Sequence, residues 1–257
     1  MSGAGEGAYG QGAPAVTPRL VACYFRTNTN GDPTIWPRLS RVFRHCAVMN
    51  LPGWRLEIEE LEPWPFKSSR AIPADGHNTQ KLEHWARRVS EAHDGDRLLL
   101  VDADTVILRD LKDVWLREFD VAFTRRPRGY PYNAGVVFVR VSQLVRAFFE
   151  KWTEENRRML VDRPYHATWQ KRYGGLNQAA LGMLLETGAA EGLRVMDLEC
   201  RIWNCEDSTW QDFSSETRIL HVKSALRMAV ISKVYSEPGL RKLAEFWRTL
   251  EAQAKAG

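Results

Sequence analysis

Short apolar runs alternate along this chain with longer segments in which apolar residues recur every three or four positions. The runs predict buried strands, and they lie at residues 19–25, 54–61, 98–102, 120–124, 135–140, 193–198 and 218–222. The periodic segments predict amphipathic helices, at residues 35–49, from Asn78 or Thr79 to Gly95, from Ser142, at 176–184 and from 236 onward. Strands that alternate with helices predict an α/β fold, with a mostly parallel sheet covered by helices on both faces.

The remaining segments are polar or rich in turn-forming residues. Residues 62–76 contain several prolines and predict a loop, residues 125–131 form a basic loop, and residues 162–174 are polar and aromatic with no clear period. Residues 1–18 are rich in Gly and Ala and nearly free of large apolar residues, so we expect a disordered tail there. We expect residues 19–257 to form a single domain.

Two carboxylates follow the most apolar of the predicted strands, in the sequence LLLVDADTVIL at residues 98–108. If this strand continues through Asp102 and Asp104, both side chains face the same side. At the end of a strand in an open α/β sheet they would reach the crevice in which such sheets bind ligands. Two carboxylates there favour Mg²⁺ or Mn²⁺ with phosphate oxygens. By themselves, the two residues fit an ordinary turn equally well.

Three further polar segments follow in order. Asn133, Ala134 and Gly135 enter a predicted strand, where small residues allow a ligand to approach the backbone. Asn177 and Gln178 begin a helix, where free N–H groups favour anions or hydroxyls. Each segment taken alone is more typical of a plain turn or helix start.

The last segment is RILHVKS, in which His221 ends a predicted strand and Lys223 follows two residues later. A neutral imidazole is a good third ligand for Mn²⁺. A lysine can neutralise a phosphate. A single histidine is more often structural, so the case depends on the order in which these segments occur.

Composition and charge exclude several classes of protein. No apolar run approaches the roughly 20 residues of a membrane helix, and the N-terminus lacks the pattern of a signal peptide, so we expect a cytoplasmic protein without a transmembrane segment. The four cysteines match neither a disulfide framework nor a zinc motif. Cys200 and Cys205 are close in sequence, and we expect them to be reduced rather than to bind metal. The net charge of +4 is weakly in favour of an anionic ligand.

The order Asp-x-Asp, Asn-Ala-Gly, Asn-Gln, then His near Lys resembles the GT-A glycosyltransferases of family eight, which include glycogenin-like enzymes and bacterial lipopolysaccharide galactosyl- and glucosyltransferases. The resemblance covers residues 19–224. It implies a GT-A fold, which is a Rossmann-like, mostly parallel mixed sheet flanked by helices. It also implies a nucleotide-sugar donor, usually a UDP-sugar, bound with Mn²⁺ (or Mg²⁺), and transfer of a hexosyl group to a hydroxyl acceptor with retention of configuration.

The resemblance also implies roles for particular residues. The metal ligands would be Asp102, Asp104 and His221. The residues expected to bind the nucleotide-sugar are Lys81, Asp102, Ala103, Asn133, Ala134, Gly135 and Lys223, with Lys223 at the pyrophosphate. Asn177 and Gln178 would be catalytic, with Gln178 under the sugar.

The sequence departs from the family pattern in three places, the first of which is the first strand, which continues as Cys23-Tyr24-Phe25-Arg26-Thr27 and not with the family's usual opening. The family usually has His-x-Gly-x-x-Lys-Pro-Trp, whereas here Lys223 comes two residues after His221 and no Pro-Trp follows. Asn177 stands where the family usually has Asp, which leaves the sugar open. An inverting enzyme would need a carboxylate as general base. The loops offer Glu206, Asp207 and Asp212, and nothing singles one out, which favours retention.

The acceptor is not identified by the sequence: a glycan, a small molecule and DNA all fit. The basic loop with Arg125, Arg126 and Arg128, and the aromatic stretch at 165–173, suit a sugar or a splayed nucleic acid, although a solvated basic face is the commoner explanation. A phage-type DNA glycosyltransferase acting on a hydroxylated base is therefore an alternative. A nucleotidyltransferase and a non-catalytic nucleotide-sugar-binding module are the other two. The first would be expected to have a glycine-rich phosphate loop, which TNTNGDP at residues 27–33 matches poorly.

Overall fold

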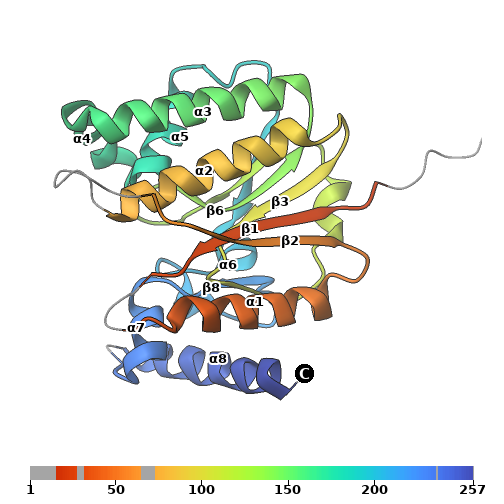
Figure 1. Ribbon diagram of the computed structural model, residues 1–257, viewed down its shortest axis with the longest axis vertical. Helices are drawn as coiled ribbons and strands as arrows, with labels where there is room; N and C mark the ends of the chain where they lie inside the picture. Colours follow the sequence, from red (N-terminus) through yellow and green to blue (C-terminus); the bar gives the residue numbers. More distant parts are fainter. Residues whose placement is uncertain (1–15, 28–31, 65–72, 236, 257) are drawn as a thin grey trace, which may run out of the picture.

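The fold is built on a six-stranded sheet, seen between two layers of helices in the computed structural model (Figure 1). The structure describes residues 16–27, 32–64, 73–235 and 237–256. The strand order is β2-β1-β3-β6-β5-β7. β6 runs antiparallel to both of its neighbours, and the other adjacent pairs are parallel. These strands are β1 (Arg19–Phe25), β2 (Arg55–Leu61), β3 (Arg97–Val101), β5 (Val121–Arg125), β6 (Tyr132–Arg140) and β7 (Val195–Glu199).

The central strands are apolar on both faces because each face contacts a separate core. In β3, Leu98 and Leu100 belong to one core, whereas Leu99 and Val101 belong to the other. The first core is covered by α2 (Pro73–Glu91), α3 (Gln143–Val161) and α5 (Leu176–Glu186), the helices drawn above the sheet in Figure 1. The second is covered by α1 (Ile35–Asn50), the short helix η1 (Lys112–Leu116) and α6 (Cys200–Trp203). The continuous apolar runs of the sequence are therefore explained by burial on both sides.

A third core lies beyond α1. It contains residues of α7 (Ser224–Ser232) and α8 (Pro238–Ala256), and Figure 1 shows α8 alongside α1. A separate two-stranded antiparallel sheet, β4 (Thr105–Ile107) with β8 (Ile219–His221), contributes Val106 and Leu220 to this core. The strand predicted at 218–222 therefore exists, but it pairs outside the main sheet.

The predicted α/β class and mostly parallel sheet are confirmed, but several elements differ from the expectation. α2 begins at Pro73, so the predicted loop at 62–76 ends earlier, and Asn78 and Thr79 lie inside the helix. Thr79 does not cap the helix, because its hydroxyl donates to the carbonyl of Asp75 and accepts from Asn156. β4 and α7 were not predicted.

α4 (Arg163–Tyr173) was also not predicted, because its sequence shows no helical period. Among its side chains only His166 and Tyr173 are buried, so the helix does not require a continuous apolar face. Its ends are nevertheless well defined. The Asp162 side chain accepts from the Tyr165 N–H at 2.9 Å, and Gly174 ends the helix with φ 87°.

Within the part of the chain that the structure describes, no helix has both the length and the apolarity required to cross a bilayer. Residues 1–15 lie outside that part, so the predicted tail there stays a prediction, as does the single domain at 19–257.

Candidate functional site

The site is a cavity of about 300 Å³ at the sheet edge where β1 and β3 end and β6 begins. Because β6 is antiparallel, its first residues lie beside the last residues of β3. α2 and α5 contribute to the wall from one side, and β8 and the start of α7 from the other. Every site residue predicted from the sequence lines this cavity: Lys81, Asp102, Ala103, Asp104, Asn133, Ala134, Gly135, Asn177, Gln178, His221 and Lys223.

Asp102 and Asp104 lie in a tight turn rather than in a strand. β3 ends at Val101, and the carbonyl of Asp102 accepts from the Thr105 N–H at 3.1 Å. The expectation that strand alternation would bring the two carboxylates to one side was therefore wrong. The turn brings them together instead, because β4 leads away directly after Asp104. The Asp102 N–H donates to the Gly135 carbonyl at 2.9 Å, which fixes the turn to β6.

The small sheet of β4 and β8 places His221 beside the two carboxylates. His221 pairs with Thr105 across β4 and β8, and the Val222 N–H donates to the Asp104 carbonyl at 2.7 Å. Side-chain ligand atoms of Asp102, Asp104 and His221 all lie within 4.8 Å of one another. In the described part of the chain this is the one cluster of His, Cys, Asp or Glu with such spacing.

A chain of hydrogen bonds sets the tautomer of His221. Asn204 donates from Nδ2 to the hydroxyl of Thr124 at 2.9 Å, and that hydroxyl donates to the Asn133 carbonyl at 3.0 Å. The Asn204 Oδ1 is thereby turned towards His221 Nδ1, at 3.0 Å. With a proton on Nδ1, the lone pair of Nε2 points at the carboxylates, 3.1 Å from Asp104 Oδ1 and 3.7 Å from Asp102 Oδ2.

This arrangement fits a divalent cation. Three acceptor atoms converge on one place, and a carboxylate pair with a neutral imidazole is a donor set that suits Mn²⁺. The space is kept open by Gly135, where an added Cβ would lie 2.6 Å from His221 Cε1 and 2.9 Å from Asp102 Oδ2. Burial raises the pKa of the nearby Cys23 thiol to about 12, and Cys23 does not belong to the cluster of ligand atoms.

Two cations accompany the carboxylates. Lys81 forms an ion pair with Asp102, and its ammonium group lies over the Trp85 ring at 4.6 Å. Arg227, in the first turn of α7, forms an ion pair with Asp104. Burial alone would raise the pKa of the Asp104 carboxyl, but positive charge beside it, that of Arg227 included, lowers this pKa well below its usual range.

The residues expected around the sugar are held by protein contacts. The register of β6 shifts between its pairings of Phe123 with Val137 and of Thr124 with Asn133, so residues 134–136 bulge against β5. Asn133 accepts from the Gly135 N–H at 2.7 Å. The Gln178 amide donates to the Tyr132 carbonyl, and among the described residues no hydrogen bond holds the Asn177 side chain.

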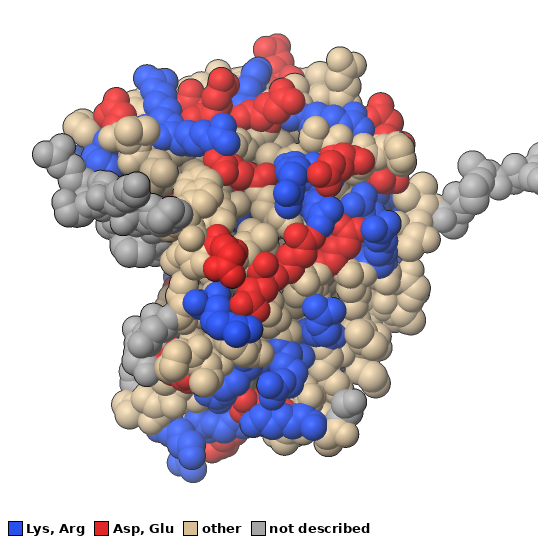
Figure 2. Space-filling view, in the orientation of Figure 1, with Lys and Arg blue, Asp and Glu red and all other residues tan. Residues whose placement is uncertain are grey.

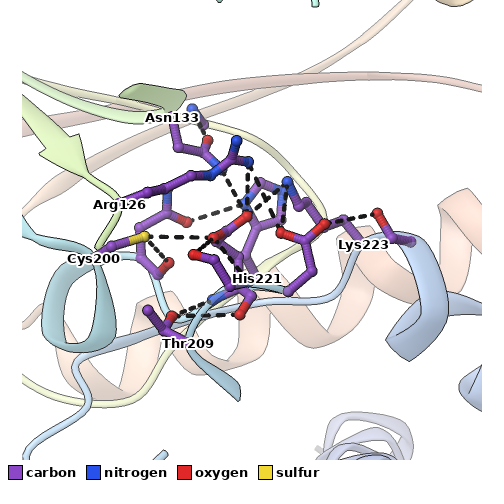
Figure 3. Close-up of polar contacts among 12 residues, drawn as sticks. Arg126, Asn133, Cys200, Thr209, His221 and Lys223 are labelled. Atoms are coloured by element: carbon purple, nitrogen blue, oxygen red, sulfur yellow. Dashed lines mark hydrogen bonds and ion pairs between the residues drawn. The ribbon is translucent and has the colours of Figure 1, made fainter. Parts of the chain in front are cut away.

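Lys223 is held by carboxylates other than those of the Asp-x-Asp turn. Its ammonium lies 2.8 Å from Glu206 Oε2 and 3.4 Å from Asp207 Oδ1. Glu206 also accepts from Arg126 at 2.7 Å, and in Figure 3 the side chains of Arg126 and Lys223 approach this centre from opposite sides. The cation of this segment that reaches the Asp-x-Asp carboxylates is thus Arg227.

Much of the predicted basic loop is neutralised. Arg125 pairs with Asp197 at 2.6 Å, and Arg126 is a buried partner of Glu206 rather than a solvated surface charge. In the aromatic stretch, Arg172 pairs with Glu186 at 2.6 Å. Figure 2 shows Lys and Arg interspersed with Asp and Glu over the face in view, without a continuous basic band.

Cys200 and Cys205 are buried free thiols. Burial raises the pKa of both. Neither belongs to the cluster of Asp102, Asp104 and His221, and their expected reduced, non-ligating state stays a prediction.

Sequence reasoning missed Asn204 and Arg227 and did not single out Glu206. Asn204 carried no signal, because it ends a short helix in a polar region. Arg227 would have required α7 to be recognised, since only a helix after Lys223 turns its side chain back to Asp104.

Comparison with known proteins identifies the fold. No protein-family model and no curated protein matches the sequence. Among solved structures, a glycosyltransferase involved in glycosylation of the major capsid of PBCV-1 is similar, with a TM-score of 0.54 and 13% identity over 81% of this chain and 95% of that one. The glycosyltransferase GlyE of Streptococcus pneumoniae TIGR4 is similar with a TM-score of 0.52 and 16% identity, over 94% of this chain and 64% of GlyE.

The fold is that of a GT-A glycosyltransferase. In this chain the fold contains a sheet in which β6 is reversed, and the carboxylate turn follows β3. Structural similarity at such low sequence identity establishes the fold alone, so membership of family eight stays a prediction.

Proposed function

We propose that this protein is a metal-dependent glycosyltransferase, which moves a sugar from a nucleotide-sugar donor, a UDP-sugar, to a hydroxyl acceptor with retention of configuration. The observation that carries the proposal is the convergence of Asp102, Asp104 and His221 in the main cavity of a glycosyltransferase fold. A non-catalytic binding module has no need for three such ligands around an open position.

The difficult part of the reaction is the departure of a nucleoside diphosphate, on which negative charge develops. A divalent cation held by Asp102, Asp104 and His221 would act as a Lewis acid for the oxygens of this diphosphate. Arg227 and Lys81 lie beside the same carboxylates and add fixed positive charge at the place where the diphosphate charge develops. Lys223 stays our candidate for the pyrophosphate, because it lines the cavity although Glu206 holds it.

Asn177 and Gln178 are proposed to orient the sugar. Both lie in the first turn of α5 and line the cavity. Since the Nε2 of Gln178 is engaged by the Tyr132 carbonyl, its Oε1 is the atom available to the sugar. The amide of Asn177 can accept or donate, so it can bind a sugar hydroxyl in either sense. Holding the sugar in one orientation lowers the entropic part of the barrier.

Retention is supported by the carboxylates of the cavity. Among the described residues that line it, the only carboxylates are Asp102 and Asp104, which we assign to the metal. Glu206 is unsuited as a general base, because it is fully buried and accepts from several donors at once. Without a free carboxylate, the acceptor hydroxyl has no obvious protein base of the kind that inversion requires.

The acceptor is proposed to be a carbohydrate or small molecule. The DNA alternative depended on the basic loop and the aromatic stretch, and three arginines of these segments, Arg125, Arg126 and Arg172, are each paired with a carboxylate. Duplex binding that weakens steeply with salt would restore that alternative.

The direct test is the metal-dependent release of nucleoside diphosphate from UDP-, GDP- and dTDP-sugars by the wild type and by Asp104→Ala. We expect Mn²⁺-dependent hydrolysis of the UDP-sugar by the wild type and its loss in the variant. Asp113→Ala is the matched control, since Asp113 also pairs with an arginine, Arg218, but lies outside the cavity. Turnover by Asp104→Ala equal to that of the control would refute the metal assignment.

A further inference from the structure

Glu206 is the most completely engaged carboxylate near the cavity, and it is not part of the cavity wall. It is 0% exposed. Its Oε2 accepts from Arg126 at 2.7 Å, Lys223 at 2.8 Å and Asn133 at 3.3 Å. Its Oε1 accepts from the Ser208 N–H at 3.1 Å and from the Ser208 hydroxyl. A buried carboxylate is retained at a cost in desolvation that only such a set of partners offsets.

Two of these partners face the cavity. Lys223 and Asn133 both line it, and the third partner, Arg126, reaches Glu206 from the loop between β5 and β6. Figure 3 shows Asn133, Arg126 and Lys223 arranged around one centre, although Lys223 is distant in sequence from the other two. One carboxylate thus fixes a lysine from the start of α7 and an amide from the start of β6.

Glu206 is itself fixed by main-chain contacts to the segment that contains His221. The Cys205 N–H donates to the Ile219 carbonyl, and the His221 N–H donates to the Cys205 carbonyl, both at 2.8 Å. A turn closes behind it, since the Thr209 N–H donates to the Glu206 carbonyl at 2.7 Å. The backbone therefore places the carboxylate before any ligand arrives.

We propose that Glu206 is a positioning residue of the donor site, which holds the Lys223 ammonium and the Asn133 amide at the cavity wall without touching the donor. This inference rests on the proposed function. Lys223 has four flexible side-chain bonds, and free in solvent it would spread over many rotamers. Held by Glu206, it presents its charge in one place, which reduces the entropy lost when an anionic donor binds.

Electrostatics and positioning predict opposite results when the charge of Glu206 is removed. Removal of a negative charge beside an anion site should by itself tighten the binding of a nucleoside diphosphate. Loss of positioning should weaken it. Glu206→Gln keeps the size of the side chain, and Glu206→Asp keeps the charge but withdraws it by one methylene, so the two variants separate these effects.

The test is calorimetric titration of UDP with Mn²⁺ into the wild type, Glu206→Gln and Glu206→Asp. Positioning predicts that both variants bind about tenfold more weakly, the lower end of the loss when an outer partner of a site is removed. The matched control is Glu251→Gln, because Glu251 is also a buried partner of an arginine, Arg38 at 2.7 Å, but lies on α8 outside the cavity. Unchanged or tighter binding by Glu206→Gln would overturn the proposal, as would an equal loss in Glu251→Gln.

A second measurement separates this inference from the proposed function. If titration of UDP, GDP or dTDP into the wild type gives no more heat than titration into buffer, the proposed function fails. The positioning role of Glu206 is then tested by the rate at which acetic anhydride acetylates Lys223, measured by mass spectrometry. We expect Lys223 to be acetylated several-fold faster in Glu206→Gln than in the wild type, with the exposed Lys242 as internal reference. An unchanged rate at Lys223 would overturn the positioning role.

Discussion

The cavity has two walls that are held in different ways. The first wall consists of the Asp102–Asp104 turn and the start of β6, and main-chain hydrogen bonds between β3 and β6 fix it. The second wall is formed by His221, Lys223 and Arg227, and polar side chains behind it provide most of its fixing contacts, such as those of Asn204 and Glu206. The first wall is a continuation of a regular ladder, whereas the second depends on individual side chains that have no repeating pattern.

This difference has consequences for how each wall tolerates change. A ladder distributes its hydrogen bonds over many residues, so only a steric clash displaces it. A buried polar network loses more, because the removal of one member leaves its partners unsatisfied. Substitutions in the two walls should therefore differ in kind, and three experiments test this.

The largest effect is expected from Gly135→Ala in the first wall. The added Cβ would lie 2.6 Å from His221 Cε1, so the imidazole and the Asp102 carboxylate must move apart. We expect Mn²⁺ binding to be lost, and overpacking to destabilise the fold by about 1–3 kcal/mol. Calorimetry with Mn²⁺ and thermal unfolding would measure the two effects. Gly239→Ala is the control, since nothing lies within 4 Å of its Cβ; retention of Mn²⁺ affinity in Gly135→Ala would show that the ligands have another arrangement.

An intermediate effect is expected from Asn204→Ala, behind the second wall. Without Asn204 Oδ1, the Nδ1–H of His221 loses its acceptor, and the tautomer that directs Nε2 to the carboxylates is no longer favoured. Loss of such an outer partner weakens metal binding by about 10- to 100-fold. Asn156→Ala is the matched control, because Asn156 is equally buried and donates to Thr79 at 2.7 Å, away from the site. If both variants bind Mn²⁺ alike, Asn204 does not orient His221.

The smallest effect concerns stability at acid pH. Asp104 joins the two walls, and positive charge beside it, that of Arg227 included, lowers the pKa of its carboxyl in the folded protein, against the effect of burial. A carboxyl with a lowered pKa stabilises the fold above its unfolded value of about 3.9 and loses this contribution as the pH falls further. In metal-free protein, the free energy of unfolding should therefore decline less steeply below about pH 4 in Asp104→Asn than in the wild type. Denaturant unfolding between pH 5 and 2 would measure it, and parallel curves would contradict the assignment.

The same contrast explains what could be predicted. The strands and the main helices followed from apolar periodicity, and the first wall followed from them, since Asp102 directly follows β3 and Gly135 lies near the start of β6. The carboxylates were predicted together for a wrong reason, because they meet in a turn and not along a strand. α4 and α7 were not predicted. α4 has few buried residues, and α7 is a short helix that directly follows the predicted His-x-Lys segment.

The sequence by itself determined the α/β class, the order of the central elements and the residue types around the cavity, because apolar periodicity and strand-end polarity are local properties of the chain. The tertiary structure decided which cation meets which carboxylate. Arg227 reaches Asp104, and Lys223 is taken by Glu206. Those pairings join residues far apart in the chain, and their geometry arises only when the small β4–β8 sheet and α7 are packed beside the main sheet.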